Sequence, residues 1–88
     1  MRYYANFKAN NGTSFASPIE SDNKNELIKA IRSIAEANRF QGNSCSWFVW
    51  YIDYKTYKSQ ASVCVASGGI GRDGKRYRDK IRKGGEIM

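Results

Sequence analysis

The sequence predicts an α+β domain in which an antiparallel sheet of about four strands packs against one amphipathic helix. Three features lead to this prediction: an aromatic and β-branched run at 44–54, a helical pattern of apolar residues at 23–40, and strand-like alternation at 2–9. The predicted order is ββαββ, followed by a short basic helix. With 88 residues, the chain has room for one core only.

The run at 44–54 holds both tryptophans and is the densest apolar stretch of the chain, which favours a central strand. Side chains of a strand alternate between the two faces of its sheet. One face would carry Trp47, Val49 and Tyr51, and the other Phe48, Trp50 and Ile52. Because both faces are apolar, we expect the amphipathic helix to cover one of them. The face that holds Trp47 would then meet the C-terminal helix or a partner.

The alternating residues 2–9 and the Asn-rich residues 10–12 predict an N-terminal hairpin. A three-residue turn sets Phe7 opposite Phe15 and gathers the apolar side chains on one face, so we prefer this register. Pro18 has no backbone N–H to donate. The second strand is therefore expected to lie at a sheet edge or to end there.

The predicted helix covers residues 23–40. Asn23 is a suitable N-cap, and Glu26 stands at the capping-box position three residues later. Gly42 follows the last periodic residues and is a natural stop. The apolar stripe of this helix consists of Leu27, Ile28, Ala30, Ile31, Ile34, Ala35 and Ala37.

A further strand is expected at about residues 60–66, and it completes a second hairpin. One of its faces offers the small residues Ser62, Cys64 and Ala66, which would either let large neighbours pack over them or floor a shallow groove. We assign residues 1–70 to the α+β domain. Residues 71–88 form a basic, Gly-rich loop and tail helix that is part of this domain or docked on it.

Residues 69–75 match the G-x-x-x-x-G-K spacing of a phosphate-binding loop. Arg76 occupies the Ser/Thr position that would bind magnesium, and no parallel sheet is predicted, so we do not expect nucleotide hydrolysis. Two interpretations remain. The loop is a flexible glycine linker, or its backbone N–H groups bind a phosphate of a nucleic-acid backbone.

Catalysis has little support in this sequence. The chain contains no histidine, which removes the commonest general base and metal ligand. Cys45 and Cys64 are too few and too far apart for a disulfide scaffold or a zinc site, and the carboxylates form no recognisable acid/base pair. We therefore predict a protein that is not an enzyme, with no catalytic residue, no metal site and no cofactor.

The N-terminus has no hydrophobic signal core, and no apolar run is long enough to span a bilayer. We expect a cytoplasmic protein without a membrane partner. The formal charge of +7 and a pI near 9.7 favour an anionic partner. Residues 71–88 concentrate this charge, because they hold seven Lys or Arg residues against three acids.

The function predicted from these features is non-catalytic binding of nucleic acid or of a nucleoprotein, through the basic C-terminal segment and sheet aromatics. The cationic contacts would come from Arg72, Lys75, Arg76, Arg78, Arg82 and Lys83. The stacking or anchoring candidates are Trp47, Tyr51 and Tyr57.

Two alternatives use the same residues. The first is a protein-directed inhibitor or adaptor, such as a phage or mobile-element factor that blocks a nucleic-acid-handling protein, for example a host nuclease. Here the arginines would meet acidic side chains and the aromatics would be hot spots. The second is self-association through the apolar sheet face, which would give a symmetric homodimer.

Overall fold

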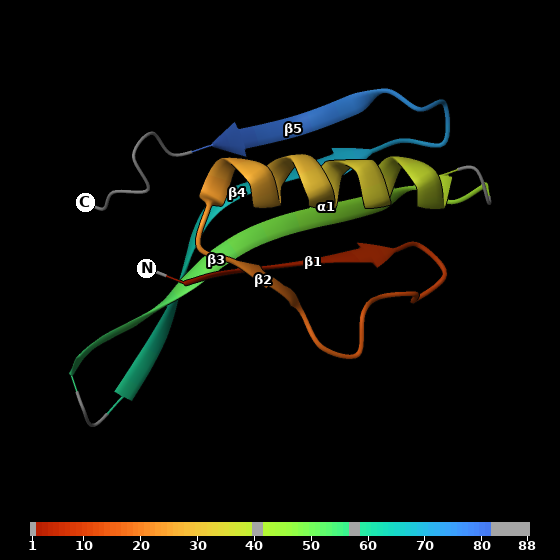
Figure 1. Ribbon diagram of the computed structural model, residues 1–88. Helices are drawn as coiled ribbons and strands as arrows, with labels where there is room; N and C mark the ends of the chain where they lie inside the picture. The colour runs from red at the N-terminus through yellow and green to blue at the C-terminus, as the bar shows by residue number, and fades with distance from the viewer. Residues whose placement is uncertain (1, 40–41, 57–58, 82–88) are drawn as a thin grey trace.

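The computed structural model describes residues 2–39, 42–56 and 59–81, and they form one antiparallel sheet with a helix packed across one face (Figure 1). The α+β class is confirmed, but the sheet has five strands rather than about four, in the order β2-β1-β3-β4-β5. The elements are β1 (Tyr3–Ala9), β2 (Ile19–Ser21), α1 (Lys24–Arg39), β3 (Cys45–Thr56), β4 (Ser59–Ile70) and β5 (Arg76–Ile81).

The aromatic run forms β3, the middle strand of the sheet, as predicted. Trp47 and Val49 are fully buried and pack in one core with Leu27, Ile28 and Ile31 of α1. The helix therefore covers the face that we expected to meet a tail helix or a partner. The face left without a described helix is the one that carries Phe48 and Trp50.

The N-terminal hairpin has a different register from the predicted one. Residues 10–18 form a loop, and β2 pairs Ala5 with Ile19, two residues along from the prediction. A shift of two keeps every side chain on its face. The rings of Phe7 and Phe15 still meet edge to face at 5.1 Å, although Phe15 lies in the loop. As expected from Pro18, β2 is an edge strand that begins directly after the proline.

The helix begins and ends close to the predicted residues. The Asn23 side-chain oxygen accepts a hydrogen bond from the Glu26 backbone N–H at 3.0 Å, which satisfies a donor of the first turn. The Glu26 carboxylate accepts a weaker bond from the Asn23 side-chain amide at 3.4 Å. Gly42, the predicted stop, has a positive φ of 81°.

Strand β4 is longer than predicted and includes Gly68, Gly69 and Ile70. A register shift beside Val65 turns both Val65 and Ala66 toward the core, so Ala66 leaves the small-residue face predicted for it. Ser62 and Cys64 remain on the opposite face. The glycines lie within the strand because each makes room for a large neighbour, as described below.

The prediction of a C-terminal helix is wrong for the described part of the chain, because residues 76–81 form β5 and pair with β4. The i, i+4 spacing of Tyr77 and Ile81 suggested a helix. However, such a short basic helix has little apolar surface, whereas pairing satisfies the backbone groups at the edge of β4. Residues 76–81 are therefore a strand of the sheet, residues 71–75 form the turn that leads to it, and residues 82–88 lie outside the described residues.

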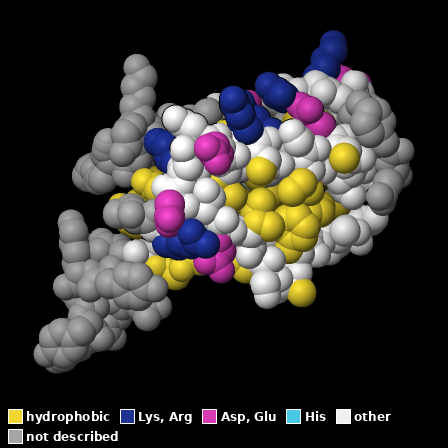
Figure 2. All heavy atoms as spheres, in the orientation of Figure 1, with side chains coloured by type: hydrophobic (Ala, Val, Ile, Leu, Met, Phe, Trp, Pro, Cys, Tyr) yellow, Lys and Arg dark blue, Asp and Glu magenta, His cyan; other side chains and the backbone are white. Residues whose placement is uncertain are grey.

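Strand β5 is also joined to α1 by two ion pairs. Arg32 Nη2 lies 2.8 Å from Asp79 Oδ2, and Arg76 Nη2 lies 2.8 Å from Glu36 Oε2. Figure 2 shows this side of the molecule, where Lys and Arg side chains lie beside Asp and Glu side chains. Residues of the predicted basic tail thus take part in the fold itself.

Candidate functional site

The candidate site is the sheet surface opposite α1, which we call the open face. Its residues form three cross-strand rows, set by the strand register. The first row runs Lys8–Ser46–Gly69–Tyr77, the second Asn6–Phe48–Ser67, and the third Tyr4–Trp50–Cys64. No helix of the described residues lies over these rows (Figure 1).

Aromatic rings run across two of these rows. The rings of Tyr4 and Trp50 are stacked at 26° with centroids 6.1 Å apart, and Phe48 lies 5.6 Å from Trp50. Phe48 is 36% exposed, and Tyr4 and Trp50 are half-buried. The rings support one another from the side and leave apolar surface accessible. A ligand with flat apolar groups can use such a surface without displacing any element of the fold.

Tyr77 adds a fourth ring at the β5 end of the first row. A Cβ atom placed on Gly69 would be 2.5 Å from its Cζ and 2.8 Å from both Cε atoms, so the ring face lies directly on the Gly69 backbone. Only glycine leaves room for this contact. The side chain is 40% exposed, and its ring forms a flat platform on the sheet.

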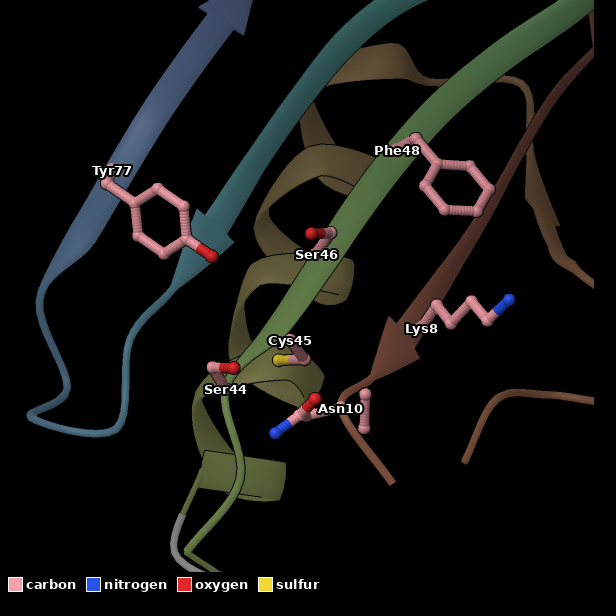
Figure 3. Close-up of a pocket in the computed structure, with 8 residues that line it drawn as sticks. Lys8, Asn10, Ser44, Cys45, Ser46, Phe48 and Tyr77 are labelled. Carbon is pink, nitrogen blue, oxygen red and sulfur yellow. The ribbon is translucent and has the colours of Figure 1, made fainter. Parts of the chain in front are cut away.

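Two of the hollows on the open face differ in character. One of about 460 Å³ lies at the first row, between Phe48 and Tyr77, and is lined with polar groups of Lys8, Asn10, Ser44 and Ser46 (Figure 3). The other, of about 400 Å³, lies at the third row and is lined by Phe48, Trp50, Ser62 and Cys64. The first hollow can form hydrogen bonds to a ligand, whereas the second is mainly apolar.

Some cations of the described chain have no acidic partner, and one of them, Lys8, lines the first hollow. Among the described residues, Lys8 on β1 and Arg72 and Lys75 in the β4–β5 turn form no ion pair. By contrast, four of the chain's eight acids already face arginines: Glu20 and Asp22 bind Arg2, and Glu36 and Asp79 bind the arginines named above. Positive charge without an acidic partner is thus present at Lys8 on β1 and in the β4–β5 turn.

Two of the predicted aromatic contacts lie in the core. Trp47 is 0% exposed and lies beneath the Arg32 guanidinium, which is 5.3 Å from its ring centroid. Tyr51 is buried on the same face. Neither ring can stack on a ligand in this fold, so both assignments are corrected. Tyr57 lies outside the described residues.

The predicted cationic contacts divide into three groups. Arg72 and Lys75 are exposed in the turn, as a binding role requires. Arg76 is engaged with Glu36, so its first role is in the fold. The backbone of Arg78 belongs to β5. Arg82 and Lys83 lie outside the described residues.

The glycine motif at 69–75 does not form a phosphate cradle. The Gly71 N–H donates to the Lys75 carbonyl at 2.9 Å, and the Gly74 N–H donates to the Gly71 carbonyl at 2.9 Å. The Lys75 N–H donates to the Asp73 carboxylate at 3.0 Å. Because a tight hairpin turn uses these donors internally, the backbone interpretation of phosphate binding is not supported. The flexible-linker interpretation also fails, since the turn closes a paired hairpin.

The two thiols have different surroundings. Cys45 is buried, and its thiol donates to the Ala35 carbonyl at 3.1 Å; burial raises its pKa, an effect that the nearby Asn38 side chain partly offsets. Cys64 is exposed on the open face beside the aromatic rings. Within the described part of the chain, no cluster of Cys, Asp and Glu side chains could hold a metal ion.

Sequence reasoning missed Tyr4, Lys8, Phe48 and Trp50 as site residues because it chose the wrong face of β3. One signal was present. Trp47 needs space beside it, and Gly68 in the adjacent strand offers that space on the face where the helix lies.

The described chain contains no helix long and apolar enough to cross a bilayer. No family model matches this chain, and no curated protein and no solved structure matches it either.

Proposed function

We propose that this protein is a non-catalytic binding protein whose open face holds single-stranded nucleic acid. One observation carries the proposal: accessible aromatic rings lie together on the face of the sheet that no described helix covers, in a chain of formal charge +7. Unpaired bases would stack on Trp50, Phe48 and Tyr77. Such stacking contributes about 1–3 kcal/mol per base in other proteins and needs no particular sequence.

The phosphates would contact cations at the rim of this face. Lys8, Arg72 and Lys75 are exposed and have no acidic partner among the described residues, so they can bind phosphate without breaking an ion pair of the fold. The charge also favours this partner over a second copy, because two chains of +7 repel each other. A double helix is less suitable, since its bases cannot reach the rings.

Fluorescence anisotropy with labelled 15-nucleotide single strands of DNA and RNA tests the proposal. Micromolar binding at low salt is expected. With roughly three phosphate contacts, the slope of log K against log salt should be about −2. Trp50→Ala should weaken binding about tenfold, whereas Trp50→Phe keeps a ring and should retain most of it. No binding at low salt would overturn the proposal and leave the protein-directed inhibitor or adaptor.

The position of the bound nucleic-acid strand can be tested on the unaltered protein through the reactivity of Cys64. Its thiol lies in the hollow between Phe48 and Trp50, and the second cysteine, Cys45, is buried. A bound strand should therefore slow the reaction of Cys64 with a maleimide. Binding without protection of Cys64 would place the nucleic acid elsewhere. A duplex of the same length is the control and should protect it far less.

A further inference from the structure

The polar hollow at the first row has features that the apolar hollow lacks. It lies between two rings, Phe48 and Tyr77, and its floor is Ser46 on β3 (Figure 3). Lys8 stands across the sheet from Tyr77, three strand spacings or roughly 14 Å away by register. The hollow has a volume of about 460 Å³, which is within the usual range for small-ligand sites, about 300–1,000 Å³.

Three polar side chains that line this hollow are not used by the described part of the fold. Among the described residues, no hydrogen bond engages the side chains of Asn10, Ser44 or Ser46. The Asn10 backbone N–H donates to the Ser44 carbonyl at 2.8 Å, which joins the two segments and sets the points from which both side chains project. Amide and hydroxyl groups held in this way can read the edge of a base.

We infer that this hollow is a subsite for one unpaired nucleoside 5′-phosphate unit of the bound strand. The base stacks on the Tyr77 ring beside Phe48, its edge meets Ser46 and Asn10, and its phosphate binds the Lys8 ammonium. This inference rests on the proposed function and adds a position to it. Base preference arises at the Tyr77 end of the open face, while Trp50 at the other end stacks on any base.

The first test uses mononucleotides and needs no variant. Nucleoside 5′-monophosphates of all four bases, in ribose and deoxyribose forms, are titrated into the isotope-labelled protein and followed by NMR. The backbone signals of Ser46, Gly69 and Tyr77 should shift and saturate, with a dissociation constant that differs between bases. Inorganic phosphate should move signals near Lys8 without moving that of Gly69. Equal dissociation constants for all bases, or shifts confined to Trp50, would overturn the inference.

The second test uses single-stranded oligonucleotides that differ at one base. Tyr77→Ala should weaken binding about tenfold and abolish the base preference, while Tyr77→Phe should keep the stacking. Lys8→Ala should reduce the salt slope by about 0.7. Lys29→Ala, which removes the same charge from an exposed position on α1, is the matched control and should change neither quantity.

The outcomes separate the subsite from the proposed function. If oligonucleotides bind and Trp50→Ala weakens them, but Tyr77→Ala and Lys8→Ala do not, the subsite is wrong and the proposed function stands. If no oligonucleotide binds at low salt, the proposed function fails and the subsite with it. If the same signals shift with protein concentration alone, a second copy occupies the hollow and the inference is overturned. Gly69→Ala, which displaces the Tyr77 ring, should reproduce the effect of Tyr77→Ala.

Discussion

Trp47 and Trp50 lie three residues apart in the same strand and have opposite surroundings. Trp47 lies between α1 and Gly68 with none of its surface exposed. Trp50 lies on the open face, half-buried between Tyr4 and Phe48. One ring is enclosed by the fold and the other is supported only from the side. Aromatic content alone therefore does not identify a binding residue; the face of the strand on which the residue lies does.

The largest expected effect comes from truncating these two side chains. Trp47→Ala should lower the free energy of unfolding by about 3–5 kcal/mol, because it leaves a cavity under the helix. Trp50→Ala should lower it by about 1 kcal/mol and instead weaken nucleic-acid binding. Urea denaturation followed by circular dichroism measures both. Equal losses of stability would show that the fold holds Trp50 as firmly as Trp47 and would contradict the difference between the two faces.

The adjacent glycines of β4, Gly68 and Gly69, show the same difference between the two faces of the sheet. A Cβ on Gly68 would meet the Asp79 carboxylate and lie 2.7 Å from two atoms of the Trp47 ring, neither of which can move freely. Gly68→Ala should therefore cost about 2–3 kcal/mol of stability. Gly69→Ala displaces only the half-exposed Tyr77 ring, and its cost should stay below about 1 kcal/mol.

Thermal and urea unfolding of the two glycine variants provide the measurement. Each serves as the control for the other, since both add one methyl group to neighbouring positions of the same strand. A Gly69→Ala protein as unstable as Gly68→Ala would show that Tyr77 is held as firmly as the core. In that case the open face would be a second core surface.

Breaking the ion pairs between α1 and β5 should lower the free energy of unfolding by an intermediate amount. The Arg32–Asp79 pair is three-quarters buried and lies over the Trp47 ring, whereas Arg76–Glu36 is about half exposed. Asp79→Asn should cost about 1–2 kcal/mol, because Arg32 then keeps its charge without a partner. Glu36→Gln should cost less than about 1 kcal/mol, as is usual for exposed pairs. A double-mutant cycle for each pair measures the coupling, and equal couplings would contradict this ranking.

The sequence predicted the elements that depend on local pattern. The period of the apolar residues identified α1, the Asn23 cap located its start, and the density of β-branched and aromatic residues placed β3 at the centre. These properties are set within a few residues along the chain. For this reason they could be read before any contact was known.

What could not be predicted depends on partners distant in sequence. The register of β4 places Gly68 beside Trp47, and this contact decides which face α1 covers. Residues 76–81 form a strand because β4 extends as far as Ile70 and leaves an edge to pair with. The open-face site followed from these two facts. Choosing the Trp47 face therefore misassigned the stacking residues, although the aromatic strand had been identified.

The smallest expected effect is on the pH dependence of the free energy of unfolding, and it comes from the buried Cys45 thiol. Burial raises the pKa of Cys45 above its ordinary value of 9.0, so the folded state holds its proton when the unfolded state has lost it. The stability from the protonated thiol is complete below the unfolded pKa and is lost as pH rises toward the folded one. The slope for one proton is at most about 1.4 kcal/mol per pH unit. Urea unfolding is measured from about pH 8 to about pH 10.5, a range that spans the ordinary thiol pKa. The free energy of unfolding should decline less steeply with pH for Cys45→Ala than for the unaltered protein. Identical slopes for Cys45→Ala and the unaltered protein would contradict the expectation that burial under the helix raises the pKa of this thiol.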